Sequence, residues 1–250
     1  MNVHVFDTPD ALGAFAAQRI MRAIGARPDA VIGLATGSSP LSTYQAWAAL
    51  AAAQGTDLSG VRGFALDEYA GLDPAHPESY TSVINATVTV PVGLNPAQVR
   101  VPSGVAEPAA EAADFEAAIR AAGGVDVQLL GLGRNGHLGF NEPGSAFDSR
   151  TRTVPLTDST VRDNARFFDG DETQVPTLSI TQGIGTILEA RELVVVVIGE
   201  AKAAAAAASI EGPQSPEVPG SALRNHPNVL WLLDEAAASQ LQGRPVTLAG

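Results

Sequence analysis

The sequence contains no cysteine and only four histidines, and these absences exclude several kinds of chemistry. Without cysteine there is no disulfide, no thiolate nucleophile and no cysteine-ligated metal. No two of the histidines have the spacing of a zinc site on a helix. We therefore expect no metal cofactor. The histidines are His4, His76, His137 and His226.

Positive charge is also scarce, with 15 Lys and Arg against 27 Asp and Glu and a formal net charge of -12. This balance argues against nonspecific binding to nucleic acid or to an anionic membrane. No segment approaches the ~20 apolar residues of a membrane span, and the N-terminal residues lack the pattern of a secretion signal. We expect a cytoplasmic protein without nucleic-acid or membrane partners. An anionic substrate would then need a local cluster of cations.

What the 250 residues do contain is an alternation of short apolar runs with alanine-rich segments, which predicts one α/β domain spanning residues 1–250. The apolar runs are typical of parallel strands that are buried on both faces by helices. Residues 91–105 are predicted to be irregular, and the tail GRPVTLAG has no pattern that predicts an element. Strands are expected at 3–6, 30–34, 61–66, 125–132, 193–198 and 228–233, and helices at 9–24, 41–53, 79–84, 107–122, 157–168, 203–208 and 234–240.

The stretch 125–143 runs an apolar strand into a loop crowded with glycine and polar side chains. Ligands of open α/β sheets bind beyond the carboxyl ends of the strands, and glycines allow the backbone to approach them there. His137 lies between Asn135 and Glu142, an arrangement suited to proton transfer near neutral pH. The alternative is a surface turn with a solvated histidine.

A second loop, Thr36-Gly37-Ser38-Ser39, separates the strand at 30–34 from the helix at 41–53. Backbone N–H groups and hydroxyls at a helix N-terminus suit an anion such as phosphate. The loop has neither the Walker lysine nor a G-x-G-x-x-G pattern, which disfavours nucleotides. A turn that only caps its helix is an equally good interpretation.

Further charged residues follow other predicted strands. Asp67 and Glu68 come at the end of the strand at 61–66, where one of them could act as a general base or both could form a solvated acidic turn. Arg166 lies on a predicted helix, where arginines are usually solvated but are also suited to phosphate. Lys202 opens a helix, a position unfavourable to the helix dipole unless an anion lies between them.

Six motifs in order make the chain resemble the glucosamine-6-phosphate deaminase family. The motifs span most of the chain, so chance agreement of all six is implausible. They are LATGSSP at 34–40, LDEYAGLDPAHPESY at 66–80, LGLGRNGHLGFNEPGS at 130–145, SRTRTVPLT at 149–157, ARFFDG at 165–170 and GEAKA at 199–203.

This resemblance implies a doubly wound, mostly parallel, Rossmann-like sheet with helices on both faces and neither metal nor organic cofactor. It implies that Asp67 moves a proton between C2 and C1 of the sugar and that His137 opens the pyranose ring. Asn135 and Glu142 would support the histidine. Many members carry aspartate at Asn135, so Glu142 is expected to set the basicity of His137. The phosphate of the substrate, a small sugar phosphate, would bind Thr36, Gly37, Ser38, Ser39, Arg166 and Lys202.

Two alternatives to the deaminase remain. A 6-phosphogluconolactonase is similar in fold and phosphate loop but needs no carbon-acid base, so the DEY and HLGFNEP sequences favour the deaminase. A noncatalytic sugar-phosphate sensor is disfavoured because the chain has no attached helix-turn-helix segment. Of the effector-site residues of allosteric members, this chain keeps Arg152 but has Val154 in place of a lysine and Ala146 in place of a serine. This difference predicts a monomer or weak homo-oligomer without effector activation.

Overall fold

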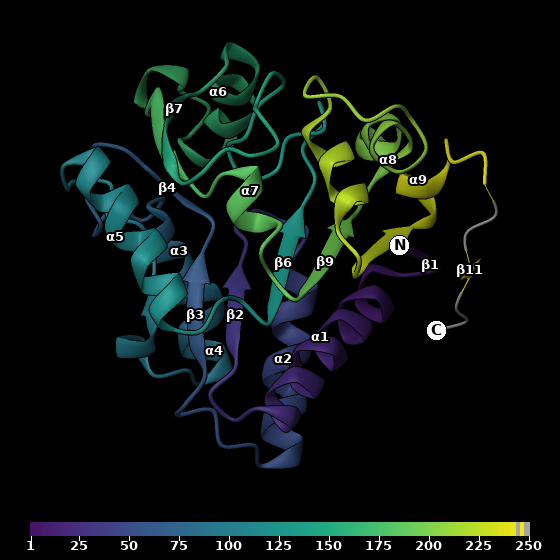
Figure 1. Cartoon of the computed structure of the whole chain (residues 1–250), viewed down its shortest axis with the longest axis horizontal. Coiled ribbons are helices and arrows are strands. Elements are labelled where there is room, and N and C mark those ends of the chain that lie inside the picture. Colours follow the sequence, from purple (N-terminus) through teal and green to yellow (C-terminus); the bar gives the residue numbers. More distant parts are fainter. Residues whose placement is uncertain (244–245, 248–250) are drawn as a thin grey trace.

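A parallel sheet organises the computed structural model, which describes residues 1–243 and 246–247 (Figure 1). Within these residues the sheet has eight strands in the order β11-β1-β10-β9-β6-β2-β3-β5, and each neighbouring pair is parallel. From β2 the chain continues outward to β3, whereas from β6 it continues the opposite way to β9. The carboxyl ends of β2 and β6 therefore flank a topological switch point, the usual place for a ligand. The strands are β1 (Asn2–Phe6), β2 (Val31–Leu34), β3 (Arg62–Ala65), β5 (Val99–Arg100), β6 (Val127–Gly131), β9 (Glu192–Val197), β10 (Val229–Asp234) and β11 (Val246–Thr247).

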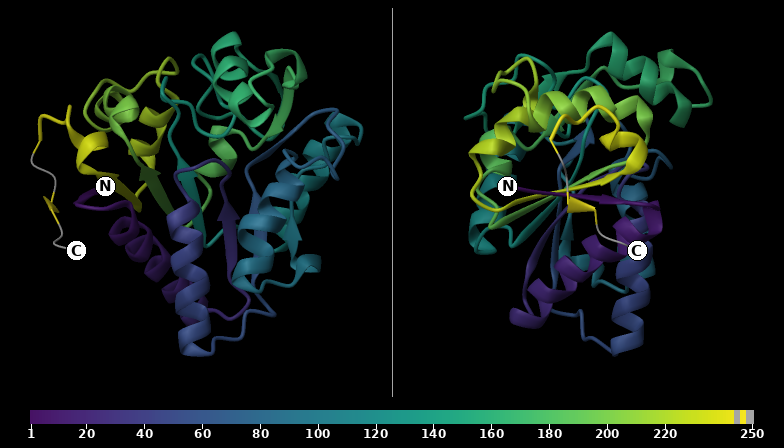
Figure 2. Two further views of the ribbon diagram at one scale, coloured as in Figure 1. Left: turned by 180° about the vertical axis from the view of Figure 1, so that it is seen from behind. Right: turned by 90° about the vertical axis from the view of Figure 1, so that its right-hand side faces the viewer.

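Helices cover both faces of this sheet, as predicted, and Figure 2 shows the two layers from the side. Alternate residues of β9 belong to opposite cores: Val194 packs with one face, and Val195 packs with the other. The first core contains α1 (Pro9–Ala26) and α2 (Leu41–Gln54), and the second contains α5 (Pro108–Ala121) and α8 (Ala203–Ile210). Burial on both faces explains why the strands read as continuous apolar runs.

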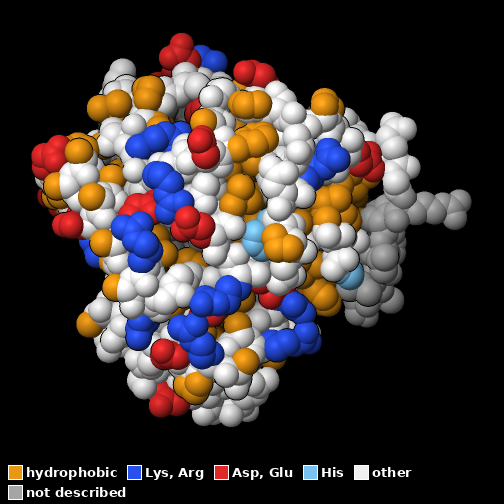
Figure 3. Space-filling view, in the orientation of Figure 1, with side chains coloured by type: hydrophobic (Ala, Val, Ile, Leu, Met, Phe, Trp, Pro, Cys, Tyr) orange, Lys and Arg blue, Asp and Glu red, His pale blue; other side chains and the backbone are white. Residues whose placement is uncertain are grey.

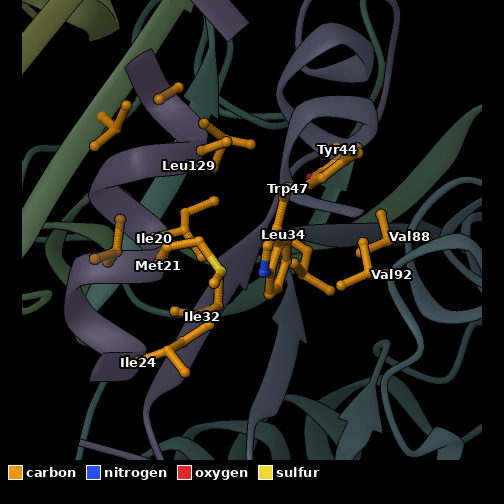
Figure 4. Close-up of a cluster of buried hydrophobic side chains, with 14 of the residues drawn as sticks. Ile20, Met21, Ile24, Ile32, Leu34, Tyr44, Trp47, Val88, Val92 and Leu129 are labelled. Carbon is orange, nitrogen blue, oxygen red and sulfur yellow. The ribbon is translucent and has the colours of Figure 1, made fainter. Parts of the chain in front are cut away.

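The core under α1 and α2 supports the end of β2 (Figure 4). Trp47 of α2 and Leu34 of β2 are both completely buried there, and each large apolar side chain that is removed from water stabilises the fold by about 1.5–3 kcal/mol. The helix α1 begins where the sequence predicts, because Thr8 caps it by accepting a hydrogen bond from the Ala11 N–H at 3.2 Å. This packing holds the loop after β2 in place.

A second, antiparallel sheet lies above the carboxyl ends of the main strands in Figure 1. It consists of β4 (Asp67–Tyr69), β8 (Leu178–Thr181) and β7 (Arg152–Pro155) in that order. The helix α6 (Asp158–Asn164) and a 3-10 turn (Ala165–Phe167) follow β7. The predicted strand at 61–66 therefore ends earlier than expected, because the chain leaves the main sheet after Ala65 and Asp67 pairs with Thr181 of β8 instead.

Two segments for which the sequence predicted no regular element, residues 91–105 and the C-terminal tail, contain short strands in the structure. The interpretation of residues 91–105 as irregular is wrong in part, since Val99 and Arg100 pair with β3 as the edge strand β5. In the tail, β11 pairs with β1, while 244–245 and 248–250 lie outside the described residues.

No helix of the described part is both long and apolar enough to span a bilayer. The division into one domain over 1–250 stays a prediction. The other helical segments are α3 (Tyr80–Ile84), a π-helical turn (Asn85–Thr89), α4 (Val90–Val92), α7 (Ile184–Ile187), α9 (Glu235–Ala238) and the 3-10 segments Pro96–Gln98, Glu172–Gln174, Glu200–Lys202 and Pro219–Asn225.

Candidate active site

A pocket of about 350 Å³ lies at the switch point, between the ends of β2 and β6 and beneath the antiparallel sheet and α6. Asp67 and His137, which are 70 positions apart in the chain, both line it. Every residue predicted to bind phosphate lines it as well, namely Thr36, Gly37, Ser38, Ser39, Arg166 and Lys202. The fold therefore brings into one cavity side chains that the sequence places on separate segments.

The loop from Thr36 to Ser39 leads into α2 with a backbone geometry suited to an anion. Gly37 has a φ of 91°, a left-handed conformation that favours glycine. Pro40 occupies the N-cap of α2 and makes no side-chain capping bond. The first N–H groups of a helix have no partner within it, so this uncapped terminus offers donors and a positive dipole end to the pocket.

Two cations approach the same end of the pocket. The Nζ of Lys202 lies 3.4 Å from the Oγ of Ser39, which joins the segment after β9 to the loop after β2. Burial, aided by the neighbouring charges of Arg166 and Arg134, lowers the pKa of Lys202 to about 8. On the face shown in Figure 3, Lys and Arg side chains lie among Asp and Glu side chains. In the pocket, by contrast, Arg166 and Lys202 come together although the net charge of the chain is -12. Such a local concentration of positive charge is favourable for a dianionic phosphate.

The two acids of the DEY sequence have different surroundings because successive side chains of a strand point to opposite faces. Asp67 is 4 % exposed and lines the pocket. Burial, followed by the charge of Glu68, raises the pKa of Asp67 from 3.8 to about 8. A carboxylate tuned in this way is suited to take a proton from carbon near neutral pH.

Glu68 instead holds the loop after β4. Its carboxylate accepts hydrogen bonds from the N–H groups of Tyr69, Tyr80 and Thr81 at 2.8–2.9 Å. It therefore fixes the start of α3 against β4 and places the ring of Tyr80 beside the pocket. The sequence did not show which of the two acids faces the ligand. In the structure Asp67 faces the pocket, and Glu68 has a structural role.

The loop after β6 holds His137 through a short chain of polar contacts. The Nδ1 of His137 lies 2.8 Å from the Oδ1 of Asn135, and the Nδ2 of Asn135 donates to the Oε2 of Glu142 at 2.8 Å. Because Nδ2 must face the carboxylate, Oδ1 must face the histidine, and an amide oxygen only accepts hydrogen bonds. Nδ1 therefore carries the hydrogen in the neutral ring, which leaves the Nε2 lone pair available to a substrate.

Opposing effects set the pKa of His137. Burial lowers it, and the charge of Glu142, whose Oε2 lies 3.8 Å from Nδ1, opposes this change. Gly133 permits the arrangement, because a Cβ at that position would lie 2.3 Å from the imidazole ring. Asn135 is neutral and only orients the ring, so the negative charge that stabilises a protonated His137 comes first from Glu142 and then from Asp163.

Sequence reasoning missed several residues of the pocket wall. Tyr80 and Phe140 stack with ring centroids 5.9 Å apart, and both line the pocket together with Asp67. Thr160 of α6 also lines the pocket, and Asn164 donates to the hydroxyl of Tyr69 at 2.8 Å. Nothing in the helical pattern of 157–168 distinguishes these polar residues from solvated ones. Among the described residues, no three His, Cys, Asp or Glu side chains converge as a metal site would require.

Comparison with known proteins agrees with this geometry. The family described as glucosamine-6-phosphate isomerases/6-phosphogluconolactonase matches residues 7–231. The chain belongs to this family. A member named glucosamine-6-phosphate deaminase from Bifidobacterium longum subsp. infantis is 53% identical over 88% of this chain and 84% of its own. Another from Cutibacterium acnes, with the same name, is 49% identical over 96% of this chain and 92% of its own.

Solved structures of the family share the fold. A structure described as a monomeric glucosamine-6-phosphate deaminase superposes with a TM-score of 0.92 at 38% identity, covering 96% of this chain and 99% of that one. A 6-phosphogluconolactonase from Trypanosoma cruzi superposes with a TM-score of 0.75 at 21% identity, covering 97% of both chains. The second likeness shows the fold alone, whereas the family members with substantial sequence identity described above carry the deaminase name.

Proposed function

We propose that this family member converts glucosamine 6-phosphate to fructose 6-phosphate and ammonia. The observation that carries the proposal is the placement of a buried, high-pKa Asp67 and an oriented His137 in one pocket with a phosphate-binding loop. An aldose-to-ketose conversion needs one group for the proton of the ring oxygen and another for the proton on carbon. The resemblance of the DEY and HLGFNEP sequences to the deaminases supports the same assignment.

In the proposed reaction the phosphate binds first-turn N–H groups of α2 together with Arg166 and Lys202. His137 then opens the pyranose ring: its Nε2 takes the proton of the C1 hydroxyl and returns a proton to the ring oxygen as the C1–O5 bond breaks. The Nδ1 contact with Asn135 keeps Nε2 free for this transfer, and Glu142 stabilises the charged imidazole between the two proton movements.

Asp67 would act on the open-chain aldose. Its carboxylate removes the proton on C2 and returns it to C1, while the amine nitrogen loses a proton and the aldehyde oxygen gains one. The aldehyde and amine thereby become an alcohol and a C2 imine. Water adds to that imine, and ammonia leaves as the C2 ketone forms. The overall reaction is therefore an isomerisation followed by hydrolytic deamination, and the protein needs no additional redox partner for it.

An ammonia assay tests the proposal directly. The protein is incubated with glucosamine 6-phosphate, and both ammonia and fructose 6-phosphate are measured. Equal amounts of both products are expected. Release of acid from 6-phosphogluconolactone without ammonia from the amino sugar would instead identify a lactonase, and binding of sugar phosphates with no turnover would identify a sensor.

We further propose a monomer or weak homo-oligomer that acts without effector activation. The structural neighbour with a TM-score of 0.92 is described as monomeric, which supports this assignment. Arg152, the residue kept from the effector site of allosteric members, is bound within its own chain: it donates to the Oδ1 of Asn141 at 2.9 Å and to the carbonyl of Arg150 at 3.3 Å. The cytoplasmic location stays a prediction.

A further inference from the structure

The helix α6 contacts the loop after β6, here called the catalytic loop because it carries Asn135, His137 and Glu142, through a buried hydroxyl. Thr160 is 4 % exposed, and its Oγ1 donates to the Oε1 of Glu142. A threonine within a helix often bonds the carbonyl one turn back, but here the hydroxyl is directed at a carboxylate from another segment. The capping of α6 does not require this hydroxyl, because the side chain of Thr157 accepts from the Thr160 N–H as the N-cap.

The two oxygens of Glu142 connect α6 to the histidine. Oε1 accepts from Thr160 and, at 3.3 Å, from Thr157, whereas Oε2 accepts from the Nδ2 of Asn135 at 2.8 Å. Asn135 in turn holds the Nδ1 of His137. The orientation of the Glu142 carboxylate is therefore fixed by hydrogen bonds to both of its oxygens. The Thr160 hydroxyl is the donor to Oε1 that lies within α6, and Thr157 is the N-cap of the same helix.

The same helical segment reaches three parts of the site. The Oδ1 of Asp163 lies 3.6 Å from a guanidinium nitrogen of Arg134 in the catalytic loop, and the Nδ2 of Asn164 donates a hydrogen bond to the hydroxyl of Tyr69 in β4. Arg166 follows in the 3-10 turn and lines the phosphate end of the pocket. The segment that packs α6 against the catalytic loop is thus continuous with Arg166, the residue that would bind the substrate phosphate.

We propose that Thr160 is a positioning residue for ring opening: its hydroxyl orients Glu142, which through Asn135 holds His137 in the Nδ1–H form. The inference rests on the proposed function for its kinetic consequence. Its structural consequence, the state of the histidine ring, is independent of turnover.

The decisive variant is Thr160→Val, which keeps the branched shape and removes only the hydroxyl. Thr160→Ser restores a donor and serves as the rescue. Thr153→Val is the matched control, because the Oγ1 of Thr153 is buried without a hydrogen-bond partner among the described residues. Binding is measured with the open-chain alcohol made by reducing glucosamine 6-phosphate, which retains the phosphate but needs no ring opening.

For Thr160→Val we expect kcat for ammonia release to fall roughly tenfold to a hundredfold, the scale for loss of a hydrogen bond to a charged group. Binding of the open-chain alcohol should stay within about twofold, because the phosphate contacts remain. Thr160→Ser should recover most of the turnover, and Thr153→Val should match the wild type. Unchanged turnover in Thr160→Val, or equal loss in the serine variant, would overturn the proposal.

Nitrogen NMR of the imidazoles supplies the readout that does not depend on activity. The His137 signal is assigned by its disappearance in His137→Gln. The wild type and Thr153→Val should show the Nδ1–H form, and Thr160→Val should show a mixture of the two neutral forms. If the wild type releases no ammonia, the proposed function fails, but an unchanged ring in Thr160→Val is what would refute the positioning role.

Discussion

Replacing Asp67 by asparagine separates the catalytic use of this carboxyl group from its effect on stability. The substitution is nearly isosteric and removes the charge that burial and Glu68 disfavour. If Asp67 is the base for the carbon-bound proton, turnover should fall by at least the ~10²-fold typical of general-base loss. Binding of the open-chain alcohol should change little, since the phosphate loop and its cations are intact.

The stability effect has a sign that follows from the raised pKa. Well below pH 3.8 the carboxyl is protonated in both states, so it contributes no pH dependence there. Between 3.8, the ordinary value, and about 8 the unfolded chain loses the proton while the folded protein keeps it, so the free energy of unfolding falls as pH rises. Each pH unit in this window costs about 1.4 kcal/mol, or about 4 kcal/mol between pH 5 and pH 8.

The assay is urea unfolding of the wild type and Asp67→Asn at pH 5 and pH 8. The asparagine variant should gain about 4 kcal/mol relative to the wild type between these pH values, a large part of the 5–15 kcal/mol typical of a domain. Asp148→Asn, which removes an exposed carboxyl, should follow the wild type at both pH values. Parallel pH dependence in the wild type and Asp67→Asn would show that Asp67 is ionised in the folded protein, and retention of more than about a tenth of the turnover would refute its role as the base.

The other predictions concern the histidine, the cations and the effector. His137→Gln should slow the closed-ring substrate far more than an open-chain aldose analogue, and equal losses on both in steady-state kinetics would argue against ring opening. Arg166→Ala and Lys202→Ala should each weaken binding of glucosamine 6-phosphate by about 1.5–3 kcal/mol, the scale of a charge-assisted contact. In calorimetry, both variants should bind unphosphorylated glucosamine almost as the wild type does. The control Arg162→Ala, which removes an exposed arginine of α6 outside the pocket, should leave binding of glucosamine 6-phosphate almost unchanged. Rate against substrate concentration should be hyperbolic with and without N-acetylglucosamine 6-phosphate, and a sigmoidal curve that the effector makes hyperbolic would contradict the proposed lack of activation.

The sequence by itself determined the strands of the main sheet other than the edge strands β5 and β11, together with its main helices, because their signals are local. Apolar runs buried on both faces identify β2, β6, β9 and β10 within one or two residues. The start of α1 follows from capping chemistry, because the side chain of Thr8 accepts from the Ala11 N–H and Pro9 occupies the first helical position. Buried strands and capped helices need only their own residues and a neighbouring layer, so their pattern is present in the linear chain.

The six ordered motifs also allowed the candidate site residues to be named from the sequence. The structure places all the predicted phosphate-binding residues, together with Asp67 and His137, around one pocket. Their roles stay predictions that the experiments above test.

Only the tertiary structure decided how the polar groups divide their tasks. The pairing of β4 with β8 joins segments that are distant in the chain, and it turns Asp67 into the pocket while Glu68 bonds the start of α3. The contact of Thr160 with Glu142 likewise depends on where α6 lies after β7. Such contacts have no periodic signal, because a hydroxyl that meets a buried carboxylate and one that meets water have the same sequence. The partner, and with it the free energy of the interaction, exists only once the chain has folded.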